Sequence, residues 1–200
     1  MDAKDLRLHR IAKQQHGVIS YAQAESVGFN ESAIRWRFDS GEWHRVLPRV
    51  ARMFWADDTL RARCWAVSLW ASAAIDNGRD WALSHQTAAA LLGFDIELKL
   101  DVHVLVPRLM APKRCDWLQR HRTLVKVHTI EVEGLRVTSP ARTFMDLAAT
   151  MAEQEAERIL RLALRCGQVT TAMLHAELRL RSSRGPAARL RKHLNSVVRV

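Results

Sequence analysis

Acidic and basic residues in the middle of the chain have a spacing that could serve metal-dependent nuclease chemistry. Glu97-Leu98-Lys99 follows Asp80 and Asp95, and restriction-type nucleases use an acid and a lysine spaced in this way to hold Mg²⁺. Such a site requires two carboxylates that converge on one metal ion. These acids lie where the edge of a strand would simply be solvated. We therefore favour an exposed strand face over a nuclease site.

Other catalytic or metal-binding patterns are weak in this sequence. The nine histidines are scattered, and the best candidates among them, His121 and His128, have no neighbouring pair of acids. The three cysteines, Cys64, Cys115 and Cys166, stand far apart without a CxxC motif, which argues against a disulfide framework and a structural zinc site. Neither GxxxxGK[ST] nor GxGxxG occurs, so no nucleotide-binding loop is visible. We predict no catalytic residues, no metal and no cofactor.

Residues 30–39 have the pattern of a helix that reads DNA. Ile34 and Phe38 lie four residues apart and would be buried together on one side of this helix. The opposite side carries hydrogen-bond donors, which suits contact with base edges in a major groove. We predict that the following residues read bases: Ser32, Arg35 and Trp36. For the tryptophan, packing beside Trp43 is an equally good interpretation.

The surrounding sequence predicts the elements that would position this helix. Ser20 can cap a first short helix, Asn30 can cap the second, and Gly28 between them suits a sharp turn. An amphipathic helix over 6–15 precedes this pair. The stretch 43–55 is rich in β-branched and aromatic residues, is broken by Pro48-Arg49, and predicts a hairpin. Three helices followed by a hairpin describe a winged helix-turn-helix.

Arginines on and near this hairpin are candidates for contact with the DNA backbone. Guanidinium groups bind phosphate oxygens well because they donate several hydrogen bonds in a fixed plane. The predicted phosphate-binding residues are Arg37, Arg45, Arg49 and Arg52.

We predict an α+β chain with two domains: a winged helix-turn-helix over 1–57 and a mixed helix/strand domain over 58–200. Ala56-Asp57-Asp58, which follows the predicted hairpin, is the expected boundary between the two. Helices are expected in the second domain at 59–75, 82–92, 140–151, 152–166, 170–180 and 187–197, and strands at 96–106, 123–130 and 133–137. Arg142 is electrostatically misplaced in the first turn of its helix, which predicts an acidic or carbonyl partner.

The charge of the chain favours an anionic partner. The formal net charge is +10, and 25 of the 31 basic residues are arginine. The alternative is a high-GC genome, which increases arginine in every protein. Residues 161–200 hold nine basic side chains against one acid, Glu177, and could form a second DNA-facing surface, a docking surface for an acidic protein, or a solvated helix face.

The sequence contains no pattern that predicts a membrane or an exported protein. The N-terminal residues are charged and lack the apolar core of a signal peptide. The most apolar run, 62–75, is shorter than the roughly 20 residues that cross a bilayer. We therefore expect a cytoplasmic protein without membrane contact.

Three segments resemble one protein family. Residues 11–50 (IAKQQHGVISYAQAESVGFNESAIRWRFDSGEWHRVLPRV) resemble the N-terminal winged-helix domain of AbiEi-type antitoxins of bacterial type IV, or abortive-infection, toxin–antitoxin systems. Residues 83–91 (LSHQTAAAL) and 137–148 (VTSPARTFMDLA) resemble the second domain of that family. At the wing, Leu47-Pro48-Arg49 stands where relatives usually have a glycine, so a splayed hairpin is expected.

The resemblance implies a function and partners. It implies a transcriptional autorepressor that binds double-stranded DNA in its own promoter and neutralises a cognate nucleotidyltransferase toxin. A dimer on DNA is expected if the operator is palindromic. Many similar chains continue into an endonuclease-like domain, whereas this sequence ends at Val200. The alternatives are the N-terminal part of a nuclease-like protein, a DNA-binding regulator outside toxin–antitoxin systems, and a module that binds only proteins.

Overall fold

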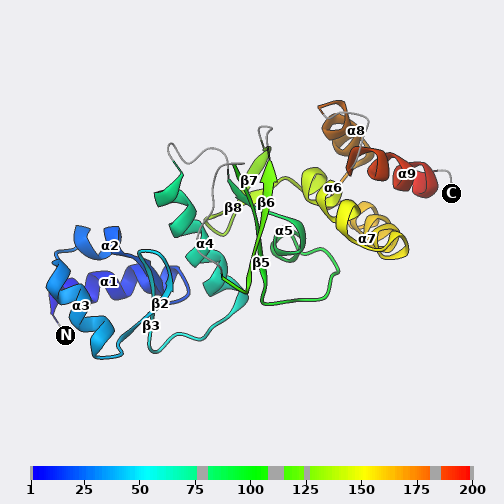
Figure 1. Cartoon of the computed structure of the whole chain (residues 1–200). Helices are drawn as coiled ribbons and strands as arrows, with labels where there is room; N and C mark the ends of the chain where they lie inside the picture. Colours follow the sequence, from blue (N-terminus) through cyan, green and yellow to red (C-terminus); the bar gives the residue numbers. More distant parts are fainter. Residues whose placement is uncertain (1, 76–80, 108–114, 124–126, 181–185, 199–200) are drawn as a thin grey trace. The chain divides into compact units, whose positions relative to one another are not determined.

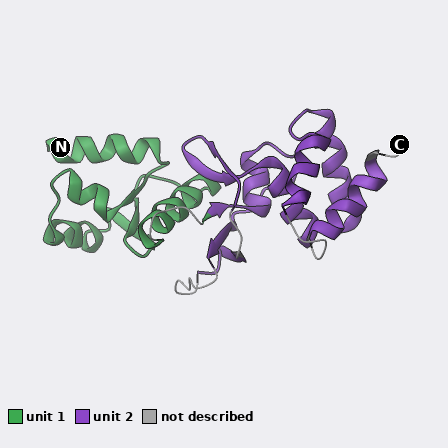
Figure 2. Cartoon of the chain, turned by 90° about the horizontal axis from the view of Figure 1, so that it is seen from above, with its two compact units in different colours: residues 1–81 green, residues 82–200 purple. Residues whose placement is uncertain are grey.

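The computed structural model describes residues 2–75, 81–107, 115–123, 127–180 and 186–198, with helices and strands mixed along the chain (Figure 1). The chain divides into two compact units, 1–81 and 82–200, which Figure 2 distinguishes by colour. The division therefore lies after Trp81, whereas the sequence suggested a boundary after Asp57. The reason is that the helix over Leu60–Ala74 packs on all three strands of the first unit.

Unit 1 combines helices with a three-stranded antiparallel sheet. Its elements are α1 (Ala3–Gln14), β1 (Val18–Ser20), α2 (Tyr21–Ser26), α3 (Glu31–Asp39), β2 (Trp43–Leu47), β3 (Val50–Met53) and α4 (Leu60–Ala74). The strand order is β1-β3-β2, so the last strand of unit 1 lies in the centre of its sheet. The three predicted helices and the hairpin are all present.

Local capping explains the helix pair α2–α3. The Ser20 Oγ accepts a hydrogen bond from the Gln23 amide at 3.1 Å, and the Gln23 side chain accepts one from the Ser20 amide at 2.9 Å. Gly28 has φ of +103°, a backbone conformation that is unfavourable for any residue with a side chain. The two helices share a core with α1 and the sheet, formed by Leu8, Ala12, Ile19, Ala24, Phe29, Ile34, Trp43, Ala51 and Met53.

Unit 2 contains a mixed five-stranded sheet in the order β6-β5-β4-β8-β7. Its strands are β4 (Ala82–Leu83), β5 (Val102–Pro107), β6 (Leu118–Thr123), β7 (Thr129–Val132) and β8 (Leu135–Thr138). The pairs β5–β6 and β4–β8 are parallel, while β4–β5 and β7–β8 are antiparallel.

Two strand predictions differ from the structure. The strand predicted over 96–106 begins only at Val102, and Leu98 and Leu100 before it are 72% and 50% exposed. Their alternation resembles a strand, but residues 96–100 do not form a strand in the described chain. β6 was not predicted because its sequence, LQRHRT, is largely polar. The strand predicted over 123–130 begins only at Thr129, and residues 124–126 lie outside the described part of the chain.

The helices of unit 2 form a second core around α6. They are α5 (His85–Leu91), α6 (Pro140–Thr150), α7 (Glu153–Arg165), α8 (Thr171–Arg179) and α9 (Pro186–Val198). α6 contacts each of the other four helices, and Phe144 and Leu147 within it are fully buried. Arg142 has an acidic partner, but on its own helix and not elsewhere in the fold as expected: its Nε donates to the Asp146 carboxylate at 2.8 Å, one turn further along α6.

Candidate nucleic-acid interface

α3 has one buried side and one exposed side, as the sequence predicted. The Asn30 Oδ1 caps it by accepting a hydrogen bond from the Ala33 amide at 2.8 Å. Ile34 is buried in the core of unit 1. Ser32, Arg35 and Trp36 are exposed, and with Glu31 and Asp39 they line a shallow hollow of about 290 Å³.

Trp36 is exposed, and the Arg37 guanidinium lies over its ring, 5.3 Å from the centroid. Its side chain is 56% exposed, whereas Trp43 is buried against Phe29 and Phe38. Arg35 is also free to move, because its pair with Glu31 spans 3.6 Å between two largely exposed side chains. Such an ion pair contributes little to stability, so the Arg35 side chain can leave Glu31 and turn toward a ligand.

Two hairpin arginines lie on the surface beside the start of α2. Arg45 donates a hydrogen bond to the Tyr21 hydroxyl at 3.0 Å and lies over the Phe38 ring. Arg49 pairs with Glu25 at 3.0 Å and lies over the Tyr21 ring. Arg49 takes the left-handed conformation, with φ of +57°, at the turn where a glycine was expected. The hairpin is nevertheless closed, since Leu47 pairs with Val50 and only a bulge interrupts the register.

The other two predicted phosphate-binding arginines have partners within unit 1. Arg37 pairs with Asp5 at 2.6 Å and with Glu42, and its side chain is only 21% exposed. It therefore ties α3 to α1 and to the residue before β2. Arg52 donates to the backbone carbonyl of Ala56 after the hairpin. We leave Arg37 out of the interface because two carboxylates hold its largely buried guanidinium, and Arg52 because its half-buried side chain is directed to a backbone carbonyl of unit 1.

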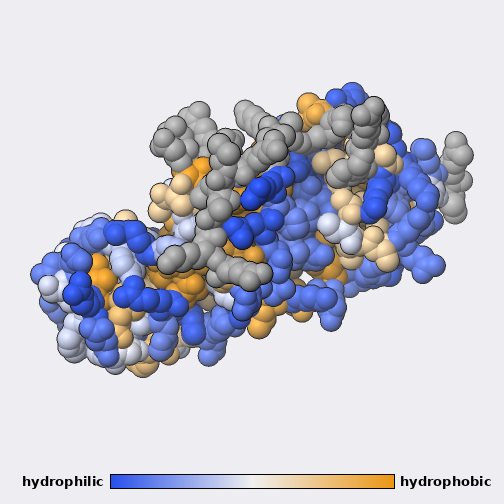
Figure 3. All heavy atoms as spheres, viewed as in Figure 1, coloured by the Kyte–Doolittle hydropathy of each residue, from blue (hydrophilic) through white to orange (hydrophobic). Residues whose placement is uncertain are grey.

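The surface of unit 1 is mostly polar on the face seen in Figure 3, where hydrophilic residues surround scattered apolar ones. Among the exposed apolar side chains are three aromatic ones, Trp36, Phe54 and Trp55. Aromatic rings among exposed arginines fit a surface that stacks on or packs against a nucleic acid.

The residues considered for nuclease chemistry do not converge in the part of the chain described. Glu97 pairs with Lys99 at 3.6 Å, and both are well exposed. Asp95 is held by Arg158 on α7. Asp80 lies outside the described residues.

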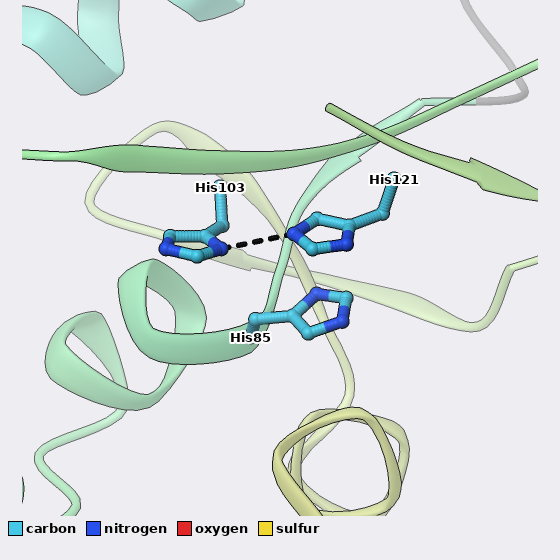
Figure 4. Close-up of side chains that lie close together, drawn as sticks. All are labelled: His85, His103 and His121. Atoms are coloured by element: carbon cyan, nitrogen blue, oxygen red, sulfur yellow. Dashed lines mark hydrogen bonds between the residues drawn. The ribbon is translucent and has the colours of Figure 1, made fainter. Parts of the chain in front are cut away.

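Three histidines of unit 2 come together in a way that the sequence did not suggest (Figure 4). His103 Nδ1 and His121 Nε2 are 2.9 Å apart, and the rings of His85 and His121 stack at 3.6 Å between centroids. His128, by contrast, faces Glu177 at 3.2 Å. Spacing along the chain gave no signal for this cluster, since its members lie on three different elements.

Burial keeps these imidazoles neutral. Desolvation, followed by electrostatic interaction with His121, His103 and Arg142, lowers the pKa of His85 to about 2. Desolvation and His103 lower the pKa of His121 to about 4. Burial also lowers the pKa of His103, which the Asp101 carboxylate partly offsets.

Comparison with known proteins identifies the second unit. The profile of the AbiEi antitoxin C-terminal domain matches residues 82–196, and so begins where unit 2 begins. The chain belongs to the AbiEi antitoxin family. This family membership indicates an antitoxin role in a toxin–antitoxin system and implies a toxin as partner. No curated protein matches the chain.

A solved structure similar to this AbiEi-family chain supports the fold along most of its length. It is the crystal structure of the RV2827C protein from Mycobacterium tuberculosis, with a TM-score of 0.58 and 16% sequence identity. The match covers 98% of this chain and 78% of that one. At this identity the likeness concerns the fold alone. Among the described residues of the AbiEi-family chain, no helix has both the length and the apolar composition needed to cross a membrane.

Proposed function

We propose that this chain is a DNA-binding antitoxin that represses its own type IV toxin–antitoxin operon and neutralises a cognate nucleotidyltransferase toxin. It would act in the cytoplasm, without catalytic activity of its own, and a palindromic promoter site would require a dimer. The observation that carries the DNA-binding part is the exposed side of α3, where Ser32, Arg35 and Trp36 face solvent while Ile34 is buried on the opposite side.

The order of elements in unit 1 supports this proposal. Helix, strand, two helices and a hairpin is the order typical of a winged helix-turn-helix, in which the second helix of the pair enters the major groove. In this arrangement Arg35 donates to guanine or phosphate, and Trp36 contacts thymine methyl groups or a sugar. Arg45 and Arg49, next to α2, bind backbone phosphates.

The experiment is a comparison of two arginine variants on two DNA fragments. Binding of the full-length protein to its promoter and to a scrambled duplex is measured by fluorescence anisotropy at fixed salt. Arg35→Ala should weaken promoter binding by about 1–3 kcal/mol and affect the scrambled duplex less, because it removes a base contact. Arg49→Ala should weaken both equally, because it removes a phosphate contact.

Arg165→Ala is the matched control, since Arg165 is an exposed arginine of α7 in unit 2. It should bind both fragments as the wild type does. If Arg165→Ala weakened binding while Arg35→Ala and Arg49→Ala did not, the DNA surface would be the basic C-terminal segment and the assignment to α3 would be wrong. DNA cleavage in Mg²⁺ that Glu97→Ala abolishes would favour the nuclease alternative.

A further inference from the structure

The histidine cluster of unit 2 is built on a rigid frame. His85 is the first residue of α5, His103 lies on β5 and His121 on β6. In the parallel pair β5–β6, His121 is opposite Leu105 and His103 is opposite Gln119. The two histidines are therefore diagonal neighbours on one face of the sheet, within reach of each other's side chains.

Hydrogen bonds hold the backbone around the cluster. The Ser84 amide donates to the His103 carbonyl at 2.9 Å, and the His103 amide donates to the Thr87 Oγ1 at 2.8 Å. These bonds tie the beginning of α5 to β5. The Ser84 Oγ also lies 3.0 Å from the His85 Nδ1, which is the kind of outer contact that orients a metal-binding imidazole.

The backbone of His85 is strained. Its φ is +50°, in the left-handed region that residues with a side chain rarely adopt, and the residue is nearly fully buried. Strain of this kind persists where the surrounding structure fixes a side chain in a required place, and it is frequent at functional sites. Here it directs an imidazole toward two others.

We propose that His85, His103 and His121 bind one divalent transition-metal ion of the zinc type. One ring nitrogen from each histidine lies within 4.8 Å of those from the other two. Imidazole nitrogens bind zinc at about 2.0–2.1 Å, which sets tetrahedral ligand atoms roughly 3.4 Å apart. The rings of His85 and His121 are stacked, with 18° between their planes, so the ring of His85 would have to rotate out of this stack for the three nitrogens to face one ion. Three protein ligands leave the fourth position for water.

The site would connect the sheet to the helical core of unit 2. His103 and His121 are only half-buried, so an ion can reach them from solvent. α5 packs on both β5 and α6, and an ion bound to its first residue would hold it on the strands. This inference concerns unit 2 only and does not depend on DNA binding by unit 1.

A second group of possible ligands, Glu153, Glu157 and His193, is less suitable. The Glu153 carboxylate pairs with Lys192 at 2.7 Å, and the Glu157 carboxylate accepts from Ser196 at 2.6 Å. A metal ion would have to displace these partners. This group therefore serves as the comparison site in the test.

The test measures metal binding to the full-length protein after removal of metals with a chelator. Zn²⁺ binding is measured by titration calorimetry, and Co²⁺ provides an optical spectrum that reports tetrahedral coordination. The wild type should bind one ion at the cluster, and its thermal midpoint should rise with added Zn²⁺. His103→Gln and His121→Gln should each weaken binding by about 100-fold or more and remove both the spectrum and the thermal shift.

Two control variants distinguish this site from others. His175→Gln removes an exposed histidine of α8, and Glu153→Gln alters the comparison site; both should bind as the wild type does. Circular dichroism establishes that each variant is folded, and a variant that does not fold is replaced by the corresponding Asn variant. Zn²⁺ binding that survives in folded His103→Gln and His121→Gln would overturn the proposal, as would the absence of binding in the wild type.

Discussion

At the scale of single residues, the two arginines of α3, Arg35 and Arg37, have different environments. Arg35 is 72% exposed in its side chain and makes a long pair with Glu31, whereas Arg37 is enclosed by Asp5 and Glu42. Hydrogen bonds to charged groups in partly buried positions contribute more to stability than exposed ion pairs do. Stability and DNA binding should therefore separate between these two positions.

Arg37→Ala should lower the free energy of unfolding of unit 1 by about 1.5–3 kcal/mol, because it leaves two carboxylates without their partner. Arg35→Ala, the matched control, should change it by less than about 0.5 kcal/mol. Tryptophan fluorescence in urea is a suitable measurement, since six of the seven tryptophans lie in residues 1–81. If the Arg37→Ala protein unfolded like the wild type but bound DNA poorly, Arg37 would belong to the DNA interface after all.

The buried thiol of Cys64 should make unit 1 less stable at alkaline pH. Burial in α4 raises the pKa of its thiol from 9.0 to about 12, although the charge of Arg61 lowers it slightly. The unfolded chain releases this proton at lower pH than the folded one. The stability that comes from the protonated Cys64 thiol is therefore fully present below pH 9. As the pH rises above 9, the free energy of unfolding decreases by up to about 1.4 kcal/mol per pH unit.

The measurement is the free energy of unfolding from pH 8 to 10.5 for the wild type and Cys64→Ala. The wild type should lose stability more steeply above pH 9, because only it contains the buried thiol. In the folded wild type at pH 8, a thiol reagent should modify the exposed Cys166 and leave Cys64 unmodified. Equal slopes for the two proteins would show that the thiol does not titrate on unfolding.

At the scale of elements, the hairpin turn contains a residue in an unfavourable conformation. Arg49 has φ of +57°, where glycine is favoured, so the arginine side chain is retained at a cost in stability. A contact with phosphate would explain why an arginine occupies this turn. The side chain and the backbone strain can be tested separately.

Arg49→Gly and Arg49→Ala both remove the guanidinium, but only the glycine relieves the strain. Arg49→Gly should be more stable than Arg49→Ala by about 1 kcal/mol, measured by urea unfolding. Both variants should show the same loss of DNA affinity and the same decrease, of about 1, in the slope of log affinity against log salt. Different DNA affinities for the two variants would mean that turn geometry, and not charge, controls binding.

The elements that the sequence predicted well are those determined by local chemistry. Ser20, Asn30 and Gly28 define α2 and α3 because caps and a left-handed turn act within a few residues. The exposed side of α3 followed from helical periodicity alone. β6 was missed because a polar strand is stabilised by its pairing with β5, which its own sequence does not reveal.

Features that depend on distant contacts could not be predicted. Arg37 was assigned to phosphate because its partner Asp5 lies on another helix. The cluster of His85, His103 and His121 requires the register of β5–β6 and the position of α5, neither of which is encoded by local spacing. The boundary was predicted near residue 57, directly after the hairpin, whereas the packing of α4 on the sheet extends unit 1 to residue 81.

At the scale of the whole molecule, the division into two units suggests a division of roles. The AbiEi antitoxin C-terminal domain match begins at the first residue of unit 2, and the exposed α3 side chains lie in unit 1. If repression uses unit 1 and neutralisation uses unit 2, variants of each surface should lose only one activity. In unit 2 the surface that we assign to neutralisation is a basic hollow of about 300 Å³ between α8 and α9. Its lining includes His175, Arg179 and Arg191.

The double variant Arg35→Ala/Trp36→Ala should derepress a reporter gene under the operon's promoter by about 10-fold or more. This corresponds to roughly 1.4 kcal/mol of lost DNA affinity. Cells that carry this variant should remain protected against the co-expressed toxin. Arg179→Glu/Arg191→Glu should give the reverse result if the hollow receives an acidic surface of the toxin, because like charges would then face each other. Immunoblots establish equal protein levels. Loss of both activities in both variants, at normal protein levels, would mean that repression and neutralisation require one common assembly, and that the proposed division of roles between the units is wrong.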